Sequence, residues 1–545
     1  MKNQTRLSIL FLSISAVFPA AAVQIGSDNT GQVLIYPYYT ANADNSTLLS
    51  VVNSTANAKA LKVYFYESRN GRPTLSFNLY LGGYDVWTAG VFSLGSGVGS
   101  AANLSTIDTS CTSPAIQNNN ELPMTPGGLR YVPFRDFAFT GANNDSDSNT
   151  LDRTREGFIE IIEMGTIVAD SATANALAAN VVGSVGKPVN CERIRQSFQL
   201  DGSYGSPQLG TLSSDIGPPS GGLYGTGAII NVGLGTYINY NATALEAFRT
   251  AAMHTPPNSA EPNLSNADPV SIVVTPERVI RSVWGSERVG APDGVGQRID
   301  AVSSVLAAAN LSNEFSTENG IGAASEWVIT MPTKRFYSDS LTSGSVTAIA
   351  PFTVPFNVGA PDNIAERQYN ACESVLPKMV SRVQEIVQPT LFFTVPPPST
   401  LQKSPFLCSS VSVIAFNQEI IAPNADIGTF GVATRPSKIL GAKNGQAFQT
   451  RSERGLDADS GQVELDMRSR SQYWMRPRIE VDRVMRPSRD VKPHRFVGLP
   501  IVGFWALSIE NRNAQPGVQG YYGGAFDHKR VRHCISGTSL TEACE

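Results

Sequence analysis

The sequence predicts a mainly β protein: an antiparallel, immunoglobulin-like β-sandwich at the N-terminal end, followed by a larger β-rich region with a few short helices. Near the N-terminus, short runs rich in Val, Tyr, Phe and Leu recur about every 8–14 residues, with turn residues between them. The 545 residues include 47 Gly and 34 Pro, so turns are frequent. Charged residues make up 16% of the chain, below the usual share of roughly a quarter, which is untypical of coiled coils and of charged disordered chains.

Five runs in the first mature segment are predicted to be strands. The Asn70-Gly71 pair between two of them is typical of a tight hairpin turn. In the run 61–67, apolar residues alternate with Lys62, Tyr64 and Tyr66, which predicts one buried face and one solvated face. The five predicted strands are 32–39, 48–53, 61–67, 75–81 and 84–92.

The composition divides the chain into a signal peptide at residues 1–22, the N-terminal sandwich at 23–140, and the larger β-rich region at 141–545, which has room for two subdomains. Residues 94–130, rich in Gly, Ser, Asn and Pro, are predicted to form a long loop. The strand predicted at 157–164 either returns to the sandwich or opens the next region, so this boundary stays open. Helix propensity favours helices at 169–182, 244–252 and 302–309.

The N-terminus has the three parts of a secretory signal peptide. Lys2 and Arg6 are followed by the apolar run Leu7–Phe18 and by the small residues Ala20 and Ala22. The apolar run is shorter than the ~20 residues of a membrane-spanning helix. We therefore expect a secreted or cell-surface protein, with the periplasm as the alternative, and no transmembrane segment after signal cleavage. The formal net charge of −4 gives no reason to expect nucleic acid as a partner.

An even number of cysteines in an exported chain favours disulfides. Pairing neighbours along the chain is the simplest arrangement, and it gives Cys111–Cys191, Cys372–Cys408 and Cys534–Cys544. The alternative for the last region is a zinc site formed by His528, His533 and Cys534. The chain has no Cys-x2-Cys pair, and the basic residues around these side chains oppose a cation, so we favour the disulfide.

Residues 145–156 match the spacing of a calcium-binding loop. Calcium prefers several hard oxygen ligands, and this spacing turns alternate side chains towards one point. Thr150 stands where the template has Gly, and the loop carries two arginines, so a solvated Asn- and Asp-rich loop is the alternative. The predicted ligands are Asp145, Asp147, Asn149, the carbonyl of Leu151, and Glu156.

Charge is distributed unevenly along the chain. Residues 435–495 hold 14 Lys and Arg against 8 Asp and Glu, whereas residues 101–160 hold 4 against 8. The basic segment suits an anionic surface polysaccharide, or the acidic segment of a second copy in a homo-oligomer. The plainer interpretation, which we prefer, is a solvated face whose charges pair internally.

Aromatic residues gather in the first predicted domain, and exposed aromatics can stack on sugar rings. Tyrosines also pack the cores of ordinary sandwiches, and we expect that role for most of this group. The group comprises Tyr36, Tyr38, Tyr39, Tyr64, Tyr66, Tyr84 and Trp87. No catalytic motif of the serine-hydrolase, zinc-protease, P-loop or dinucleotide-binding kinds is present, so we predict that the protein is not an enzyme.

Several segments together resemble a family of exported proteins from Gram-negative bacteria for which we know no assigned activity. They include Gly31-Gln-Val-Leu-Ile-Tyr-Pro-Tyr-Tyr-Thr40, Trp327-Val-Ile-Thr-Met-Pro-Thr-Lys-Arg-Phe-Tyr337 and Tyr522-Gly-Gly524. The resemblance spans nearly the whole mature chain. It implies a bacterial exported protein and transfers no catalytic residue.

These observations predict an exported structural or adhesive protein of the cell surface or extracellular space, one that self-assembles. The first alternative is a secreted polysaccharide-binding protein that uses aromatics near Tyr36–Tyr39. The second is a secreted glycoside hydrolase, which requires two carboxylates about 5–10 Å apart in one cleft.

Overall fold

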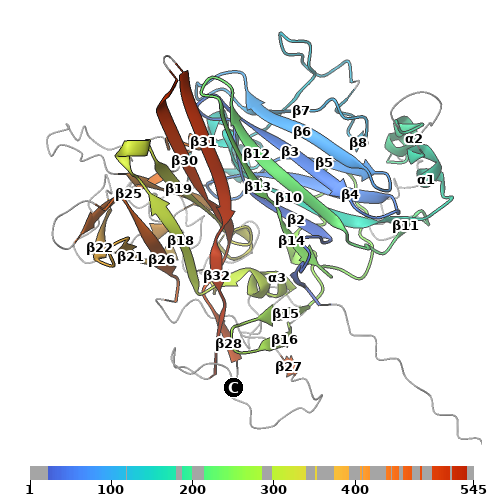
Figure 1. Cartoon of the computed structure of the whole chain (residues 1–545). Coiled ribbons are helices and arrows are strands. Elements are labelled where there is room, and N and C mark those ends of the chain that lie inside the picture. Colours follow the sequence, from blue (N-terminus) through green and yellow to red (C-terminus); the bar gives the residue numbers. More distant parts are fainter. Residues whose placement is uncertain are drawn as a thin grey trace, which may run out of the picture.

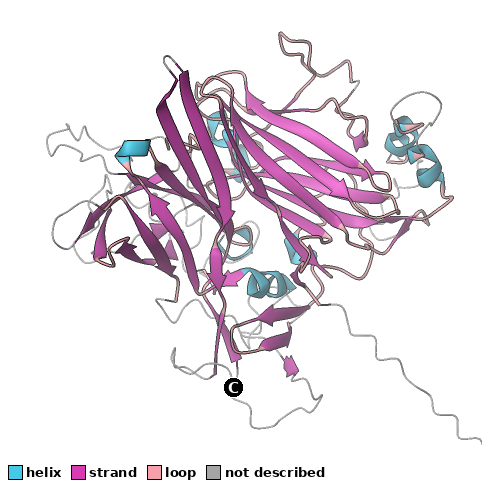
Figure 2. Ribbon diagram, viewed as in Figure 1, coloured by secondary structure: helices cyan, strands magenta, loops and turns pink. Residues whose placement is uncertain are grey.

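The structure, a computed structural model, describes residues 22–117, 119–145, 147–178, 187–198, 214–284, 298–338, 350–352, 373–391, 406–407, 409–417, 437–443, 445–452, 458–468, 479–481, 494–515 and 518–536. Within these ranges the protein consists mainly of antiparallel strands with a few short helices, which confirms the predicted class (Figure 2). The predicted signal peptide lies outside the described residues, apart from Ala22.

The first layer is an eight-stranded sheet. Its strands follow the spatial order β1-β14-β2-β10-β4-β5-β8, and β11 pairs with β10. The strands are β1 (Gln24–Ile25), β2 (Val33–Thr40), β4 (Lys59–Glu67), β5 (Pro73–Leu81), β8 (Cys111–Ser113), β10 (Glu156–Ile167), β11 (Ile216–Gly217) and β14 (Thr243–Glu246). The predicted hairpin turn joins β4 to β5, and Gly71 has the positive φ of 68° that such a turn requires.

The second layer is a six-stranded sheet in the order β13-β12-β3-β6-β7-β9. Its strands are β3 (Asn45–Asn53), β6 (Val86–Ser93), β7 (Ala102–Ser105), β9 (Val132–Pro133), β12 (Leu223–Asn231) and β13 (Thr236–Asn241). Side chains such as Val51, Trp87 and Ile229 pack from this layer onto the first one in a shared core. Tyr36 crosses that core, and its hydroxyl donates to the carbonyl of Ser50 at 2.7 Å. The two sheets form the predicted sandwich (Figure 1).

A ten-stranded sheet forms the other large part of the fold, in the order β31-β30-β19-β24-β25-β22-β21-β26-β18-β32. All its pairings are antiparallel except β24 with β25. The strands are β18 (Asn310–Ser316), β19 (Ala324–Thr330), β21 (Leu376–Ser381), β22 (Ile386–Leu391), β24 (Val411–Asn417), β25 (Gly445–Ser452), β26 (Ser460–Asp466), β30 (Val502–Gln515), β31 (Val518–Asp527) and β32 (Lys529–Val531). The rings of Tyr240 on β13 and Phe504 on β30 stack 4.8 Å apart and join this sheet to the sandwich.

Smaller elements complete the fold. β15 (Val270–Val274), β16 (Val279–Val283) and β27 (Ile479–Val481) form a three-stranded sheet. Two-stranded pairs join β17 (Ala307–Ala308) to β29 (Leu499–Pro500), β20 (Glu373–Ser374) to β23 (Phe406–Leu407), and β28 (His494–Val497) to β33 (His533–Ser536). The α-helices in the described residues are α1 (Ala172–Leu177), α2 (Cys191–Gln196), α3 (Arg298–Leu306) and α4 (Arg335–Ser338). Short 3-10 helices lie at Gly141–Asn143, Leu151–Arg155, Leu264–Asn266 and Asn319–Ile321.

The sandwich extends past the predicted boundary at residue 140. Strand β10 inserts between β2 and β4, and β12, β13 and β14 complete both layers as far as Glu246. An N-terminal unit that ended at residue 140 would leave the facing edges of β2 and β4 without hydrogen-bond partners. The boundary was therefore placed too early: the predicted strand at 157–164 returns to the sandwich.

Two local predictions were wrong, because contacts with segments far along the chain determine the structure at both places. Strand β4 has no solvated face, because the segment around Pro256 and Pro257 covers it; the carbonyls of both prolines accept hydrogen bonds from Lys62 Nζ at 2.6 and 2.9 Å. Burial lowers the pKa of Lys62 to about 7. The helix predicted at 244–252 is replaced by β14, because Thr243, Ala244 and Leu245 pair with β2 and sheet pairing outweighs helix propensity.

Candidate functional site

The predicted calcium loop is built around arginines. Arg153 Nη1 and Nη2 contact the two carboxylate oxygens of Asp145 at 2.8 and 2.6 Å, and Asp147 lies 3.4 Å from Arg69. The Leu151 carbonyl accepts from the Thr154 hydroxyl. No group of three or more His, Cys, Asp or Glu side chains arranged for a metal occurs among the described residues. Calcium binding stays a prediction, and a cation at Asp145 would have to displace a guanidinium.

Glu156, the predicted last ligand, opens β10 and is buried. One of its carboxylate oxygens accepts from the amide of Asn42 at 3.3 Å and from the backbone N–H of Lys443 at 2.8 Å. Asn149 is exposed in the described loop. The five predicted ligands are therefore not gathered around one point.

The predicted disulfide between Cys111 and Cys191 is confirmed, and it ties β8 to the start of α2. Cys534 is also in a disulfide, which removes it as a thiolate ligand for zinc. Cys372, Cys408 and Cys544 lie outside the described residues, so the other two pairings stay predictions.

The acidic and basic segments meet within one chain. Lys443 Nζ lies 3.1 Å from the Asp152 carboxylate, and that carboxylate also lies 3.8 Å from Arg155. In the basic segment, Arg468 pairs with Asp466 at 2.9 Å. These contacts fit the internal pairing that we preferred. Of the densest basic part, residues 468–495, only 468, 479–481 and 494–495 lie within the described residues, so binding of an anionic polysaccharide stays a prediction.

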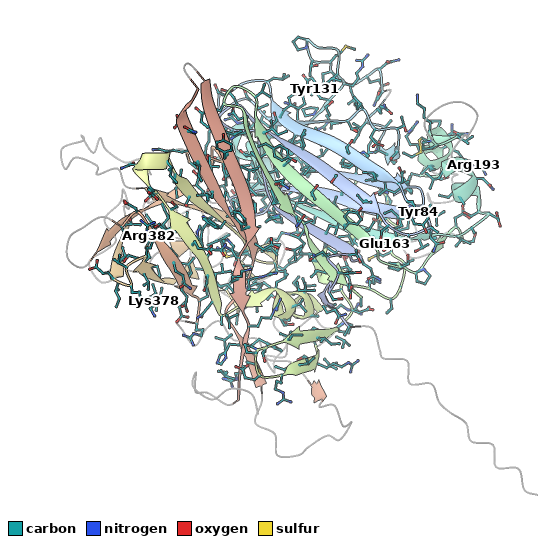
Figure 3. All side chains as sticks on the ribbon, in the orientation of Figure 1. Tyr84, Tyr131, Glu163, Arg193, Lys378 and Arg382 are labelled. Carbon is teal, nitrogen blue, oxygen red and sulfur yellow. A yellow bond between two sulfur atoms is a disulfide. The ribbon has the colours of Figure 1, made fainter. Side chains whose placement is uncertain are left out.

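The aromatic group of the sandwich packs its core. Six of its seven members are buried, whereas Tyr84, labelled in Figure 3, is 72% exposed in the turn before β6. Tyr36, Tyr38 and Tyr39 are fully buried, so a sugar-binding surface around Tyr36–Tyr39 is ruled out in this fold.

One buried carboxylate makes no well-formed hydrogen bond. Glu160 on β10 is fully buried, and its carboxylate oxygens lie near the Tyr66 hydroxyl without a hydrogen bond of ordinary geometry. Burial raises the pKa of Glu160 to about 7, although Arg335 and the Tyr66 hydroxyl nearby act in the opposite direction. The chain therefore favours the protonated form of this side chain when it folds.

We expect Glu160→Gln to stabilise the protein at high pH. The wild type holds the Glu160 proton more tightly when folded, so its stability falls as pH rises from the ordinary value of 4.5 through about 7. The variant lacks this loss, so at about pH 8 its free energy of unfolding should exceed the wild-type value by about 3 kcal/mol, while at about pH 4 the two should agree. Urea unfolding at both pH values measures the difference.

Glu163→Gln is the matched control for this prediction. Glu163 lies on the same strand and is equally buried, but it pairs with Lys59 at 2.9 Å. Its replacement leaves a buried ammonium without its counter-charge, so it should destabilise the protein at about pH 8. A Glu160→Gln variant that is less stable than the wild type at this pH would contradict the prediction.

The outer face of the six-stranded sheet is a second candidate site. None of its six strands, all of which are described, contains Lys, Arg, Asp, Glu or His. Helices α1 and α2 lie at the far edge of the sandwich and not over this sheet (Figure 1). Along β3, β12 and β13, buried inward residues alternate with outward ones, as expected for a sheet with one free face.

We call this outer surface the neutral face. Four of its large apolar side chains are about half exposed: Leu48 at 45%, Val86 at 43%, Tyr224 at 42% and Tyr237 at 56%. Pairing places Val52 between Tyr224 and Val86, and Leu48 between Ala228 and Gly90, so the apolar side chains form rows across the strands. The neutral face comprises Ser46, Leu48, Ser50, Val52, Val86, Thr88, Gly90, Phe92, Tyr224, Thr226, Ala228, Ile230, Tyr237, Asn239 and Asn241.

The ten-stranded sheet, in contrast, carries exposed charged side chains. Lys378 on β21 and Arg382 after it, both labelled in Figure 3, are exposed, as is Glu314 on β18. Charged side chains on a solvated sheet discourage association. The neutral face lacks this protection over several adjacent strands, as is typical of surfaces that meet a partner.

The chain matches no known protein-family model, no curated protein and no solved structure. Within the described part of the chain, none of the helices has the length and apolar character needed to cross a membrane.

Proposed function

We propose that this chain is an exported structural or adhesive protein of the cell surface or extracellular space, and that it associates with further copies of itself through the neutral face. The observation that carries the proposal is the absence of charge from all six described strands of a sheet whose outward apolar side chains are half exposed. The Cys111–Cys191 disulfide is compatible with an oxidising compartment.

A second copy fits this face better than an unrelated partner, because a two-fold interface brings the same surface together twice. A charged residue near such an axis meets its own like charge, and this face has none. Its polar side chains are Ser, Thr and Asn, each of which carries both donors and acceptors, so identical groups can hydrogen-bond across the axis. Ser50 and Thr226 already share such a bond, at 2.9 Å, between neighbouring strands.

The test is the oligomeric state of the purified chain over a range of concentrations, measured by sedimentation and light scattering. We expect the wild type to associate. The double variant Leu48→Lys/Tyr224→Lys places two charges against their own copies and removes two apolar contacts, so its Kd should rise by about a hundredfold or more. Repeating the series with a calcium chelator shows whether the predicted calcium loop contributes.

The matched control is Val274→Lys/Val383→Lys. These side chains are 57% and 72% exposed, and they lie on β15 of the three-stranded sheet and in the turn after β21, away from the neutral face. The control adds the same two charges and should leave the Kd unchanged. A wild-type chain that stays monomeric at every concentration, or a control that weakens association equally, would rule out the neutral face as the interface.

A further inference from the structure

A cavity of about 520 Å³ lies where β13 of the sandwich meets β30 and β31 of the ten-stranded sheet. β18 and β32 also contribute to its lining. Pockets that bind small molecules usually have volumes of roughly 300–1,000 Å³, so this one is large enough for a ligand. Its residues are far apart in the sequence and converge only when the two large parts of the fold pack together.

One wall of the cavity is aromatic. Phe526 on β31 is 52% exposed, and its ring lies 5.2 Å from that of Trp505 on β30, because the two residues are register partners. Trp505 is only 8% exposed, and its buried ring packs against the Phe526 ring. A half-exposed aromatic ring on a rigid hairpin offers an apolar face to a ring-shaped ligand at little cost in conformational entropy.

The rest of the lining offers donors and acceptors. Asn239 and Asn241 project from β13, while Glu314 and Asp527 add carboxylates and Lys529 adds an ammonium. Amides donate and accept, and carboxylates accept from pairs of hydroxyl groups. Two carboxylates against one ammonium leave a surplus of negative charge, which disfavours an anionic polymer.

Asn313, another lining residue, is fixed by the buried His528. His528 Nε2 donates to the carbonyl of Val328 at 2.9 Å, and Nδ1 accepts from the amide of Asn313 at 3.1 Å. Burial lowers the pKa of His528 to about 4, so the imidazole stays neutral and keeps this arrangement near neutral pH. The cavity is therefore pre-organised on this side.

We propose that this cavity binds a sugar unit of a neutral polysaccharide, with the sugar ring stacked on Phe526 and its hydroxyl groups hydrogen-bonded to the surrounding amides and carboxylates. A sugar combines an apolar C–H face with a rim of hydroxyls, and the lining offers a counterpart for each. The inference goes beyond self-association, although Asn239 and Asn241 belong to both surfaces.

The experiment is a glycan array of neutral glucans, mannans, galactans and chitin oligomers, with polygalacturonate and heparin as anionic probes. Calorimetry with the best neutral oligosaccharide then gives Kd values for the full chain and its variants. We expect neutral glycans to bind and Phe526→Ala to weaken binding about tenfold.

Two controls separate this inference from the proposed function. Tyr522→Ala removes an aromatic that is 59% exposed on the same strand but outside the lining, and should leave the Kd unchanged. Leu48→Lys/Tyr224→Lys should weaken self-association and still bind the oligosaccharide. Near-ultraviolet circular dichroism confirms that each variant is folded.

Three results would overturn the inference: no binding of any neutral glycan, preference for an anionic probe, or unchanged affinity in the folded Phe526→Ala variant. Because Glu314 and Asp527 line the same cavity, the mixture of protein and oligosaccharide is also monitored for new reducing ends. The appearance of new reducing ends would show that the cavity hydrolyses the glycan, and it would overturn the inference of a binding site.

Discussion

Replacing Arg153 by methionine is expected to lower the free energy of unfolding by about 3–5 kcal/mol. The Arg153 side chain is 1% exposed, and the carboxylates of Glu67 and Asp145, which it contacts, are fully buried. Its Nε and Nη2 donate to Glu67 at 2.8 and 3.1 Å, and its Nη1 and Nη2 donate to Asp145 at 2.8 and 2.6 Å. One guanidinium thus pairs with two carboxylates taken out of water, and Arg72 Nε adds a longer contact of 3.7 Å to Asp145.

The pKa shifts give the direction of this effect. Burial alone would raise the pKa of Asp145, but the hydrogen bonds and charge of Arg153 outweigh it and lower that pKa. Methionine fills a similar space without the charge, so both buried carboxylates lose their shared counter-ion, and Asp145 keeps only the longer contact with Arg72. Because carboxylates take up protons in acid, the deficit of the variant should shrink as the pH falls.

Urea unfolding of the wild type, Arg153→Met and Arg153→Lys measures this prediction. Lysine keeps the charge but cannot make both two-pronged contacts, so Arg153→Lys should fall between the other two. Arg468→Met is the control, because the Arg468 side chain is 39% exposed in its pair with Asp466 and should contribute less than about 1 kcal/mol. A loss in Arg153→Met no larger than in this control would contradict the prediction.

Removing the Cys111–Cys191 disulfide should lower the free energy of unfolding by about 4 kcal/mol. The two cysteines are 80 residues apart, and a cross-link over a loop of that length strongly restricts the unfolded chain. The expected result applies to the double variant Cys111→Ala/Cys191→Ala. The variant is preferable to chemical reduction, because Cys534 is also in a disulfide.

Hydrogen exchange locates the effect of that double variant. Ile194 of α2 and Met164 of β10 share a small satellite core with Cys111. We expect amides of α1 and α2 to exchange faster in the variant, while those of β2 and β4 in the sandwich core remain protected. A stability change below about 1 kcal/mol, or unchanged exchange in both helices, would show that packing alone holds this region.

Much of the fold could be predicted because its signals are local. The turn at Asn70-Gly71 and the alternation of the first strands fix the β4–β5 hairpin within a few residues. The buried second face of β4 could not be predicted, because its cover comes from Pro256 and Pro257, far along the chain. β14 could not be predicted either. Its Ala- and Leu-containing stretch favours a helix, and only the pairing with β2 makes it a strand.

The candidate sites also divide into those with a local sequence signal and those that arise only from contacts between distant segments. The neutral face had a local signal, since segments such as 45–53, 223–231 and 236–241 contain no charged residue. The cavity had none, because Asn239, Glu314, Trp505 and Phe526 come from four separate strands. The calcium spacing was local too, but the two arginines of the loop are bound to its carboxylates, Arg153 to Asp145 and Arg155 near Asp152, which spacing alone does not reveal.

The place of β10 between β2 and β4 has a consequence for the order in which the chain acquires its shape. A polypeptide that emerges N-terminus first, from a ribosome or a translocation pore, delivers Val33–Thr40 long before Glu156–Ile167 and Thr243–Glu246. Until those later segments arrive, β2 has neither neighbour in its sheet and cannot form its native pairings. The β4–β5 hairpin and the β3–β6 pair can form early, but β2 should remain unpaired until these later segments arrive, so the sandwich should be completed in a late step, slowed by its long-range connections.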